Sequence, residues 1–396
     1  MTTVPVPHSD VDLFADDVLT NPYPTFAELR EAGPVVWLPN LGVYALPRYA
    51  EVRQVLSDHV TFISGQGIAF NDLSNEATST NIVASDPPIH DTLRNVLAAR
   101  LSPRALRQLR TDIERQADEL VDEVVGRGSF DVVRDLARPF PLQVVADLIG
   151  LPAEGRDEVL EWAEGAFNAA GPLNERAERG LVQLQQQFTY IASFASRDKL
   201  APRSMGAAVY EAADRGEIDE AASMSLMSAY LTAGMDTTIN TIGHAVWLFA
   251  QHPDQWTRLR EDPSIIPNAF SEVLRVESPV YASGRVLSAD HDTGGVVIPK
   301  GARVALLYGS ANRDERKWTD PERFDVARDA VDHLAFGYGI HSCAGQGLAR
   351  LEAHGIFAAL ARRVEHFEAG EPVRKLNNTV RGLGSLPVTV RRAVGA

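Results

Sequence analysis

The sequence has a single cysteine, Cys343, which lies in a glycine-rich stretch at residues 336–345. One cysteine cannot form an internal disulfide, so the thiol is either a small buried apolar group or a chemically active one. Gly337, Gly339 and Gly345 flank it and let the backbone turn tightly and approach a ligand closely. A predicted helix follows at once, and its N-terminal amides favour a thiolate. The stretch can therefore hold a flat cofactor with the thiolate as its axial ligand.

A carboxylate and a hydroxyl stand side by side at Asp236 and Thr237. They lie inside a long apolar stretch that begins after Asp219, a predicted helix cap, and runs to His252. Burying an acid in a helix costs free energy unless the acid is paired or has a function. A nearby glycine and the threonine hydroxyl both loosen the helical backbone. The local pattern alone favours a threonine-rich core helix, and a proton-transfer pair is the functional alternative.

Two further pairs of ionisable residues have helical spacing. His90 and Arg94 are four positions apart, so they share one helical face, either as a solvated polar surface or as a grip for a carboxylate. Glu272 and Arg275 are three positions apart and can form an ion pair. Because such pairs are common on helices, neither indicates a function by itself.

Taken together, these motifs resemble those of the cytochrome P450 family. The family's haem-loop pattern, Phe-x-x-Gly-x-x-x-Cys-x-Gly, matches residues 336–345 without a gap. The His-x-x-x-Arg element at 90–94, the acid–alcohol pair at 236–237 and the Glu-x-x-Arg motif at 272–275 occur in family order. Arg323 matches the third charge of the last motif. The resemblance spans residues 86–350, and the segment at 21–24 agrees with it.

The resemblance implies a mainly α fold with a small β part, a triangular prism of helices around haem b. Cys343 is then the iron ligand, and its thiolate pushes electron density onto iron and favours O–O cleavage, as in other members of this family. The other residues matched to haem binding are Phe336, Gly337 and Gly345 in the loop and His90, Arg94, Arg285 and His341 around the propionates.

The implied activity is that of a haem-thiolate monooxygenase, which uses O2 and electrons from NAD(P)H passed through redox partners. Asp236 and Thr237 would supply protons to dioxygen as it is reduced. Glu272, Arg275 and Arg323 would form a buried structural network. The chain has no flavin or nicotinamide domain, so the expected electron source is an iron–sulfur ferredoxin with a ferredoxin reductase.

A basic strip is expected to receive that ferredoxin. Arginines recur at positions 100, 104, 107 and 110, and Arg350 follows the cysteine loop. Such a patch would attract an acidic partner in a salt-dependent way. The alternative is that these are ordinary surface arginines.

Composition limits the remaining partners. The net charge of −15 argues against nucleic acid as a ligand. Of the residues, 45% are hydrophobic, which is ample for a core, and we expect a single domain over residues 1–396. The first 17 residues lack the basic segment and apolar run of a signal peptide or membrane anchor. We therefore expect a cytoplasmic monomer without a membrane partner.

The substrate is expected to be small, neutral, mostly apolar and aromatic. The helix after the cysteine loop and the segment at 377–388 resemble bacterial members that oxidise para-substituted benzoic acids, including methoxybenzoates by O-demethylation. Those members grip the substrate carboxylate from a loop after the second helix, but residues 65–88 here contain no Lys, Arg or His. An unpaired carboxylate is costly to bury, so the acid specificity is not carried over. By family analogy the pocket is lined by Phe70, Ile82, Val83, Phe167, Ala229, Ala233, Val280 and Tyr281, with Ser283 and Ser385 as hydrogen-bond partners.

Other functions stay open at this point. A terpene, a fatty acid or another natural product is an alternative substrate for hydroxylation. A haem-thiolate sensor or carrier would need the Cys343 loop but neither Asp236 nor Thr237. A hydrolase using Cys343 with His341 is disfavoured, because residues two apart rarely face each other as nucleophile and base and no orienting group is evident.

The predicted elements place these motifs mainly on helices. A helix ends at Gly33, a hairpin turns at residues 39–40, and residues 61–85 form a long connection. Asp86 is predicted to cap the helix that carries His90. Residues 105–250 are predicted to be almost wholly helical, and another helix spans 267–277. The β-rich parts are 35–65, 286–310 with a hairpin over 296–307, and a strand at 386–391.

Overall fold

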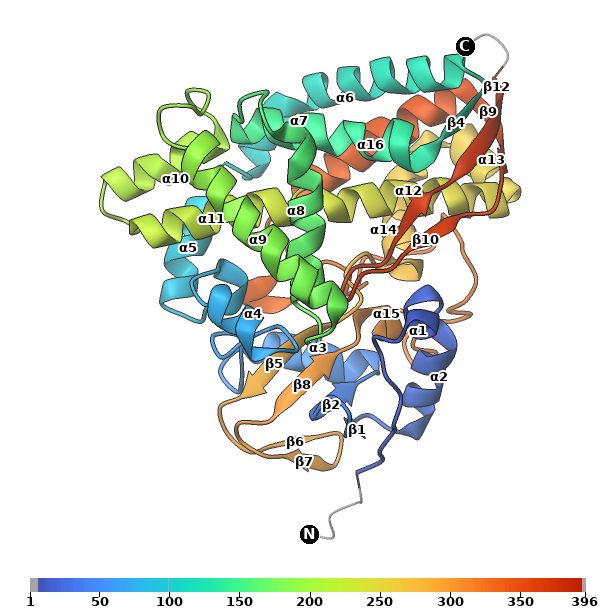
Figure 1. Cartoon of the computed structure of the whole chain (residues 1–396). Coiled ribbons are helices and arrows are strands. Elements are labelled where there is room, and N and C mark those ends of the chain that lie inside the picture. The colour runs from blue at the N-terminus through green and yellow to red at the C-terminus, as the bar shows by residue number, and fades with distance from the viewer. Residues whose placement is uncertain (1–5, 99, 394–396) are drawn as a thin grey trace.

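The computed structural model describes residues 6–98 and 100–393, which form a mainly helical body with four small sheets (Figure 1). Residues 1–5, 99 and 394–396, which belong to the expected single domain, lie outside the described residues. Helices fill the upper part of the view, and the sheet near the N-terminus lies below them, so the outline is triangular. The predicted mainly α fold with a small β part is confirmed.

One group of helices makes up the main body, and a second group lies around the N-terminal sheet (Figure 1). The helices of the main body are α5 (Ile89–Ala98), α6 (Pro103–Gly126), α7 (Pro139–Ile149), α8 (Arg156–Ala169), α9 (Glu175–Phe194), α10 (Met205–Asp214), α11 (Glu220–Ala233), α12 (Asp236–Gln251), α13 (Pro253–Glu261), α14 (Ile266–Val276) and α16 (Gln346–Arg363). The helices around the sheet are α1 (Asp16–Thr20), α2 (Tyr23–Ala32), α3 (Tyr49–Ser57), α4 (Asp72–Ala77) and α15 (Tyr308–Ala311). Apolar faces of the main-body helices meet in one large core, where Val121, Leu226 and Phe357 are fully buried.

Local capping signals set several helix ends. The Ser102 hydroxyl accepts a hydrogen bond from the backbone N–H of Ala105, and Pro103 occupies the first turn of α6. Asp219 caps α11 in the same way through the N–H of Ala222, as predicted. These caps satisfy backbone donors that have no partner within the helix.

The central helical stretch is interrupted at Gly234 and Met235. α11 ends before this point and α12 begins after it, and the two run on in nearly the same direction (Figure 1). The Thr237 hydroxyl donates to the carbonyl of Ala233 across the interruption, at 3.1 Å. The single apolar helix expected here is thus two helices, because the side-chain hydroxyl competes for a backbone carbonyl where glycine makes the chain pliable.

The largest sheet lies below the helices in Figure 1 and has the strand order β1–β2–β8–β5–β3. Its strands are β1 (Val36–Leu38), β2 (Val43–Leu46), β3 (Phe62–Ile63), β5 (Ser283–Leu287) and β8 (Arg303–Leu306). β1 and β2 form the predicted hairpin, with Trp37 opposite Tyr44. The other sheets join β4 (Ser129–Asp131), β12 (Pro387–Arg392) and β9 (Val364–Ala369); β10 (Val373–Lys375) and β11 (Gly382–Ser385); and β6 (His291–Thr293) and β7 (Val296–Ile298).

The hairpin predicted over residues 296–307 does not form. The turn is present, since the N–H of Ala302 donates to the carbonyl of Pro299 at 3.1 Å. However, β7 pairs with β6, whereas β8 pairs with β2 and β5. β8 is almost entirely buried, and it gains two strand partners in the interior of the larger sheet.

The connection at residues 61–85 is more ordered than the sequence suggests. It contains α4 and the short 3-10 helix η1 (Ile82–Ala84). The Asp86 carboxylate, predicted to cap α5, instead accepts hydrogen bonds from the backbone N–H groups of Ser64 and Gly65, at 2.9 and 2.8 Å. The prediction of that cap is therefore wrong, and the acid ties the two ends of the connection together.

Candidate functional site

The cysteine loop is shaped by two glycines in the left-handed region and by one close backbone approach. The N–H of Cys343 donates to the carbonyl of Phe336 at 2.8 Å, which closes the loop before α16. Gly337 and Gly339 have φ angles of 65° and 72°, in the left-handed region. A Cβ atom on Gly339 would collide with the carbonyl oxygen of Leu56 in α3. The sequence pattern therefore reflects a real packing constraint between this loop and α3.

The environment of Cys343 does not by itself favour a thiolate. Burial raises the pKa of the thiol, although the backbone N–H groups of Gly345 and Gln346 and the charges of Arg94 and Arg350 act in the opposite direction. The expectation that the helix N-terminus lowers the pKa of this cysteine is thus wrong in its net sign. Binding to a metal cation removes the thiol proton, so the predicted role as an iron ligand does not depend on a low intrinsic pKa.

Two histidines from distant parts of the chain meet beside this loop. The rings of His90 and His341 are 4.6 Å apart between centroids and meet edge to face. The Nε2 atoms of both rings are buried and have no hydrogen-bond partner among the described residues. Buried imidazole nitrogens are normally satisfied, so two unpaired ones side by side indicate a missing polar ligand.

Two arginines complete this cluster. Arg94 donates to the carbonyl of Ser342 at 2.7 Å, and buried Arg285 of β5 donates to the carbonyl of Gly284 at 2.7 Å. Neither forms an ion pair with a carboxylate within the described part of the chain. Burial, followed by the charges of Arg285, His90, Arg94 and His59, lowers the pKa of His341 to about 3.

The residues present fit a haem group. Two imidazole nitrogens without a hydrogen-bond partner and two arginines bonded only to backbone carbonyls lie near a partly accessible cysteine, which suits two propionates and one iron ligand. His59 was not expected from the sequence, because it belongs to no motif and reaches this cluster only through folding. Of the loop residues predicted to bind haem, Phe336 lies under the guanidinium of Arg350, 4.9 Å from its ring centroid. These haem contacts stay predictions, supported by this arrangement.

The acid–alcohol pair begins α12 at the helix interruption. Asp236 is buried and accepts a hydrogen bond from the side-chain amide of Asn240 at 3.3 Å. Burial raises the pKa of Asp236, while Lys375 acts against this rise. Thr237 is only partly buried, and its hydroxyl is held by the carbonyl of Ala233. A carboxyl group that is readily protonated beside a hydroxyl is suited to passing protons inward.

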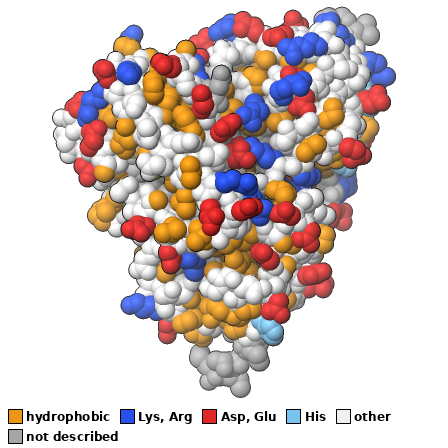
Figure 2. Space-filling model, viewed as in Figure 1, with side chains coloured by type: hydrophobic (Ala, Val, Ile, Leu, Met, Phe, Trp, Pro, Cys, Tyr) orange, Lys and Arg blue, Asp and Glu red, His pale blue; other side chains and the backbone are white. Residues whose placement is uncertain are grey.

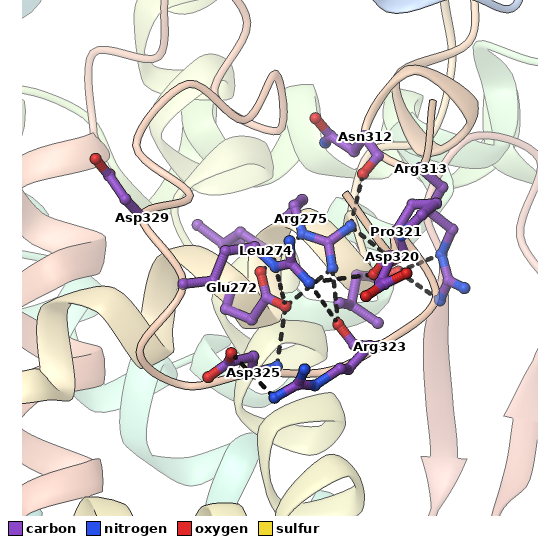
Figure 3. A network of polar contacts seen from close by, with 12 residues as sticks. Glu272, Leu274, Arg275, Asn312, Arg313, Asp320, Pro321, Arg323, Asp325 and Asp329 are labelled. Atoms are coloured by element: carbon purple, nitrogen blue, oxygen red, sulfur yellow. Dashed lines mark hydrogen bonds and ion pairs between the residues drawn. The ribbon is translucent and has the colours of Figure 1, made fainter. Parts of the chain in front are cut away.

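The Glu272–Arg275 pair is the centre of a buried network (Figure 3). Arg275 donates to both carboxylate oxygens of Glu272, at 2.7 and 2.9 Å, and both side chains are fully buried. The third charge is Arg328, whose Nε lies 3.1 Å from Glu272. The assignment of that role to Arg323 is wrong: its side chain is 62% exposed and pairs with Asp325 at 3.5 Å. Arg323 contributes its backbone carbonyl instead.

The predicted pocket residues come from separate elements and differ in their exposure. Ala229 and Ala233 lie one turn apart on α11, next to the helix interruption, and Ala233 is exposed. Val83 is also exposed, whereas Ile82 packs into the main helical core. Phe167 lies near the end of α8 and is partly buried. These positions remain proposals for substrate contact.

Other predicted pocket residues contact neighbouring residues of the protein. Phe70 packs 5.3 Å from Phe14 between ring centroids, in the N-terminal apolar cluster that also contains Tyr281. The hydroxyls of Ser283 and Ser385 are bonded to Tyr308 and Asp131, respectively. Val280 forms an isolated bridge with Val380, and the Tyr281 hydroxyl donates to the carbonyl of Asn378 at 2.5 Å. Phe70, Tyr281 and the two serines thus have partners within the protein, and their contact with substrate stays a prediction.

Comparisons with known proteins decide the family. Residues 177–390 match the family model described as Cytochrome P450. A protein named cytochrome p450 CYP199A2, from Rhodopseudomonas palustris, is 42% identical over 393 residues, which cover 98% of this chain and 95% of the relative. The chain belongs to the cytochrome P450 family. It is also 33% identical to 6-deoxyerythronolide B hydroxylase of Saccharopolyspora erythraea, over 98% of this chain and 99% of that protein.

Solved P450 structures confirm the fold. A Mycobacterium marinum cytochrome P450, CYP268A2, in complex with pseudoionone has a TM-score of 0.88 at 29% identity, covering 97% of this chain and 99% of that one. The protein is thus a P450 monooxygenase, an oxidoreductase whose family uses haem and O2 with electrons from redox partners. None of the helices in the described ranges has the length and apolar character needed to cross a membrane.

Proposed function

We propose that this P450 inserts one oxygen atom into a C–H bond of a small, neutral aromatic molecule. The overall reaction is RH + O2 + 2 H⁺ + 2 e⁻ → ROH + H2O. If the C–H bond belongs to an aryl methoxy group, the product is a hemiacetal, which breaks down to a phenol and formaldehyde. O-demethylation of a methoxyarene is therefore the same chemistry at a particular carbon.

The proposal of a neutral substrate rests on one observation: residues 65–88 contain no cationic side chain. The structure also shows that polar side chains here are used within the protein. Asn71 donates to the carbonyls of Ala169 and Gly171, both at 2.7 Å, and Asn75 accepts from the N–H of Ala69. A substrate carboxylate would find no positive partner in this loop and would lose hydration without compensation.

The residues of this chain have separate roles in binding haem, supplying protons and leaving room for the substrate. Bound haem would supply oxygen activation, with Cys343 as its ligand and His90, Arg94, Arg285 and His341 holding its propionates. Asp236 would supply protons, since burial favours its neutral form, and Thr237 beside it would orient them at the helix interruption. The small side chains Ala229 and Ala233 leave room for the substrate beside this pair.

The electrons are proposed to come from NAD(P)H through a ferredoxin reductase and an acidic ferredoxin. Arg104, Arg107 and Arg110 lie on the exposed side of α6, which packs against α16, the helix after the cysteine loop. Of the predicted basic patch, the arginines on α6 have this exposed position. Arg350, expected in the same patch, is partly buried and bonded to the Gln346 side chain at 2.9 Å.

A spectral titration with matched ligands tests the proposed substrate class. We would compare a para-methoxybenzoate with the methyl ester and with the corresponding methoxytoluene, following the shift of the haem Soret band. The neutral compounds should bind more tightly and give the fuller shift. Tighter binding of the acid would overturn the neutral assignment. Formaldehyde and phenol in equal amounts after turnover would identify O-demethylation.

A further inference from the structure

A buried cluster of charged side chains joins α2, α12 and α14 to the β10–β11 pair. Its centre is Glu277, which follows α14 directly and is buried. Arg381 donates to one oxygen of this carboxylate at 2.7 Å, and a guanidinium nitrogen of Arg313 lies 3.8 Å from the other. The Tyr23 hydroxyl also donates to the carboxylate, at 2.9 Å. One buried acid therefore serves two buried guanidinium groups.

A third guanidinium group, that of Arg374 in β10, has only a neutral partner among the described residues. It lies 3.0 Å from Nε2 of His244 in α12, and this fully buried imidazole is in turn 3.7 Å from Glu277. Because a guanidinium group has donors but no acceptor, Nε2 of His244 must accept the hydrogen bond and carry no proton. Burial, together with Arg374 and Arg381, lowers the pKa of His244 to about 3 against the effect of Glu277. The imidazole is therefore neutral and compensates no charge.

This cluster lacks one negative charge. Arg313 also pairs with Glu322, so within the described ranges three guanidinium groups share two carboxylates. Guanidinium groups in proteins stay charged, and charges that are taken out of water are normally paired. A hydrogen-bond donor is left over as well, because Nδ1 of His244, which must carry the ring proton, is buried and has no acceptor among the described residues. Both observations indicate that an acceptor from outside the chain belongs here.

Solvent can reach the unpaired guanidinium group. The side chain of Arg374 is only half-buried, and its neighbour Val373 is 60% exposed. β10 crosses in front of α12 in Figure 1, and the hydrogen bond from Arg374 to His244 joins the two elements. Basic side chains (blue) reach the surface over this part of the molecule in Figure 2. An anion from solvent can therefore approach Arg374 in a region of positive potential.

We propose that Arg374 binds a small monovalent anion such as chloride, which supplies the missing negative charge of the cluster. The anion accepts hydrogen bonds from the N–H groups of Arg374 that His244 does not use, and it stabilises the contact between β10 and α12. A divalent anion is disfavoured, because only one charge is missing and the Glu277 carboxylate lies nearby. The residues proposed to hold haem, supply protons or contact the substrate take no part, so this inference does not depend on the proposed function.

Urea unfolding of the haem-bound protein tests the site in solution. The protein is compared in sodium chloride and in sodium gluconate at equal ionic strength, because gluconate is too large for a site beside one half-buried side chain. A ligand that binds only the folded state raises stability as its concentration rises. The unfolding midpoint should therefore move upward by about 0.2–0.4 M urea between about 10 and 300 mM chloride, and it should stay in place in gluconate.

Neighbouring cations on β10 provide a matched pair of variants. Arg374→Met removes the proposed anion ligand and should abolish the dependence on chloride. Lys375→Met removes the next cation along the strand, which already has a carboxylate oxygen of Glu164 at 2.5 Å, so it should keep the dependence. Arg374→Lys retains the charge and should retain part of the chloride effect. Equal haem content and an unchanged Soret band show that each variant is folded.

Crystals grown in bromide locate the anion directly, since bromide replaces chloride and scatters X-rays anomalously. An anomalous peak within hydrogen-bond distance of the Arg374 guanidinium group is the expected result. The inference is overturned if chloride and gluconate act alike, or if Arg374→Met responds to chloride as the wild type does, and water is then the partner of Arg374. A peak at Arg374 without a chloride effect in solution would also overturn it, because it would show binding at crystal concentration only.

Discussion

The guanidinium of Arg328 lies 3.1 Å from the buried carboxylate of Glu272, and the nearby Arg323 side chain points away to Asp325. Glu272 therefore has two cationic partners, Arg275 on its own helix and Arg328 from a later loop. Arg328 also donates to the carbonyls of Thr319 and Asp320, at 2.7 and 3.1 Å. One side chain thus fastens an irregular segment onto α14.

Arg328→Ala should lower the free energy of unfolding by roughly 2–3 kcal/mol, because it removes charge-assisted bonds to a fully buried acid. Arg323→Ala, a matched change of an exposed arginine, should lie within about 0.5 kcal/mol of wild type. Urea unfolding of both variants measures the difference. Equal destabilisation by the two changes would restore Arg323 as the third member of the network.

Arg94→Ala should weaken haem retention without changing substrate preference. The expected loss is about tenfold to a hundredfold in haem affinity, corresponding to one charge-assisted bond to a propionate. Transfer of haem to apomyoglobin measures it. Arg104→Ala, an exposed arginine on α6, is the control and should retain haem normally. Wild-type retention in Arg94→Ala would leave Arg94 as a loop contact to Ser342 only.

Cys343→Ser should abolish monooxygenation while haem still binds. A serine hydroxyl cannot donate electron density to iron as a thiolate does. The reduced, CO-treated variant should lose the Soret position that marks thiolate ligation, and this spectrum is the measurement. A wild-type spectrum together with oxygen-dependent turnover would contradict the assignment of the ligand.

Thr237→Ala should divert electrons from product to hydrogen peroxide. The hydroxyl sits at the helix interruption, and its loss leaves the proton from Asp236 without an oriented acceptor. Product formed per NADH should fall about tenfold or more, with peroxide rising to match. Thr257→Ala, which removes an exposed hydroxyl on α13, should leave coupling unchanged. Full coupling in Thr237→Ala would refute the role.

Glu277 should make stability depend on acidity. Burial alone would raise the pKa of Glu277, but Arg381 and other nearby cations outweigh it and hold the pKa well below its usual range. A depressed folded-state pKa means that this stabilisation is complete above the unfolded value, about 4.3, and is lost as pH falls below it. Glu277→Gln should cost roughly 3–5 kcal/mol at pH 7, and the difference from wild type should shrink below pH of about 4.3. Urea unfolding at several pH values checks this, and a constant difference would contradict it.

Electron transfer should depend on the exposed face of α6. Arg104→Glu should slow ferredoxin-dependent reduction, and raising the ionic strength should slow the wild type, since both weaken attraction to an acidic partner. Arg391→Glu is the control, because it lies on β12 beyond the other end of α6. Reduction rates that are indifferent to salt and to Arg104→Glu would leave these arginines as ordinary surface residues.

Short-range sequence patterns, matched together to those of one family, were enough to predict a P450 monooxygenase. Three motifs are each no longer than ten residues: the cysteine loop, the 90–94 pair and the 272–275 pair. Helix or turn geometry fixes the relative positions of residues that are so close in sequence. Caps such as Asp219 and the end of α2 at Gly33 were predictable for the same reason. These local rules also showed that an acid and a hydroxyl sit side by side in an apolar stretch.

Only the tertiary structure decided which distant groups meet. Arg328 rather than Arg323 reaches Glu272, and Lys375 of β10 pairs with Glu164 of α8, because these contacts depend on how loops and sheets pack and not on spacing along the chain. The hairpin predicted at 296–307 does not form for a related reason. β8 pairs with β2 and β5, where it is buried between two strands, and not with β7 next to it in sequence, because strand pairing depends on burial against neighbours. The net rise in the pKa of Cys343 likewise reflects burial, which the surrounding fold imposes and the local helix N-terminus does not overcome.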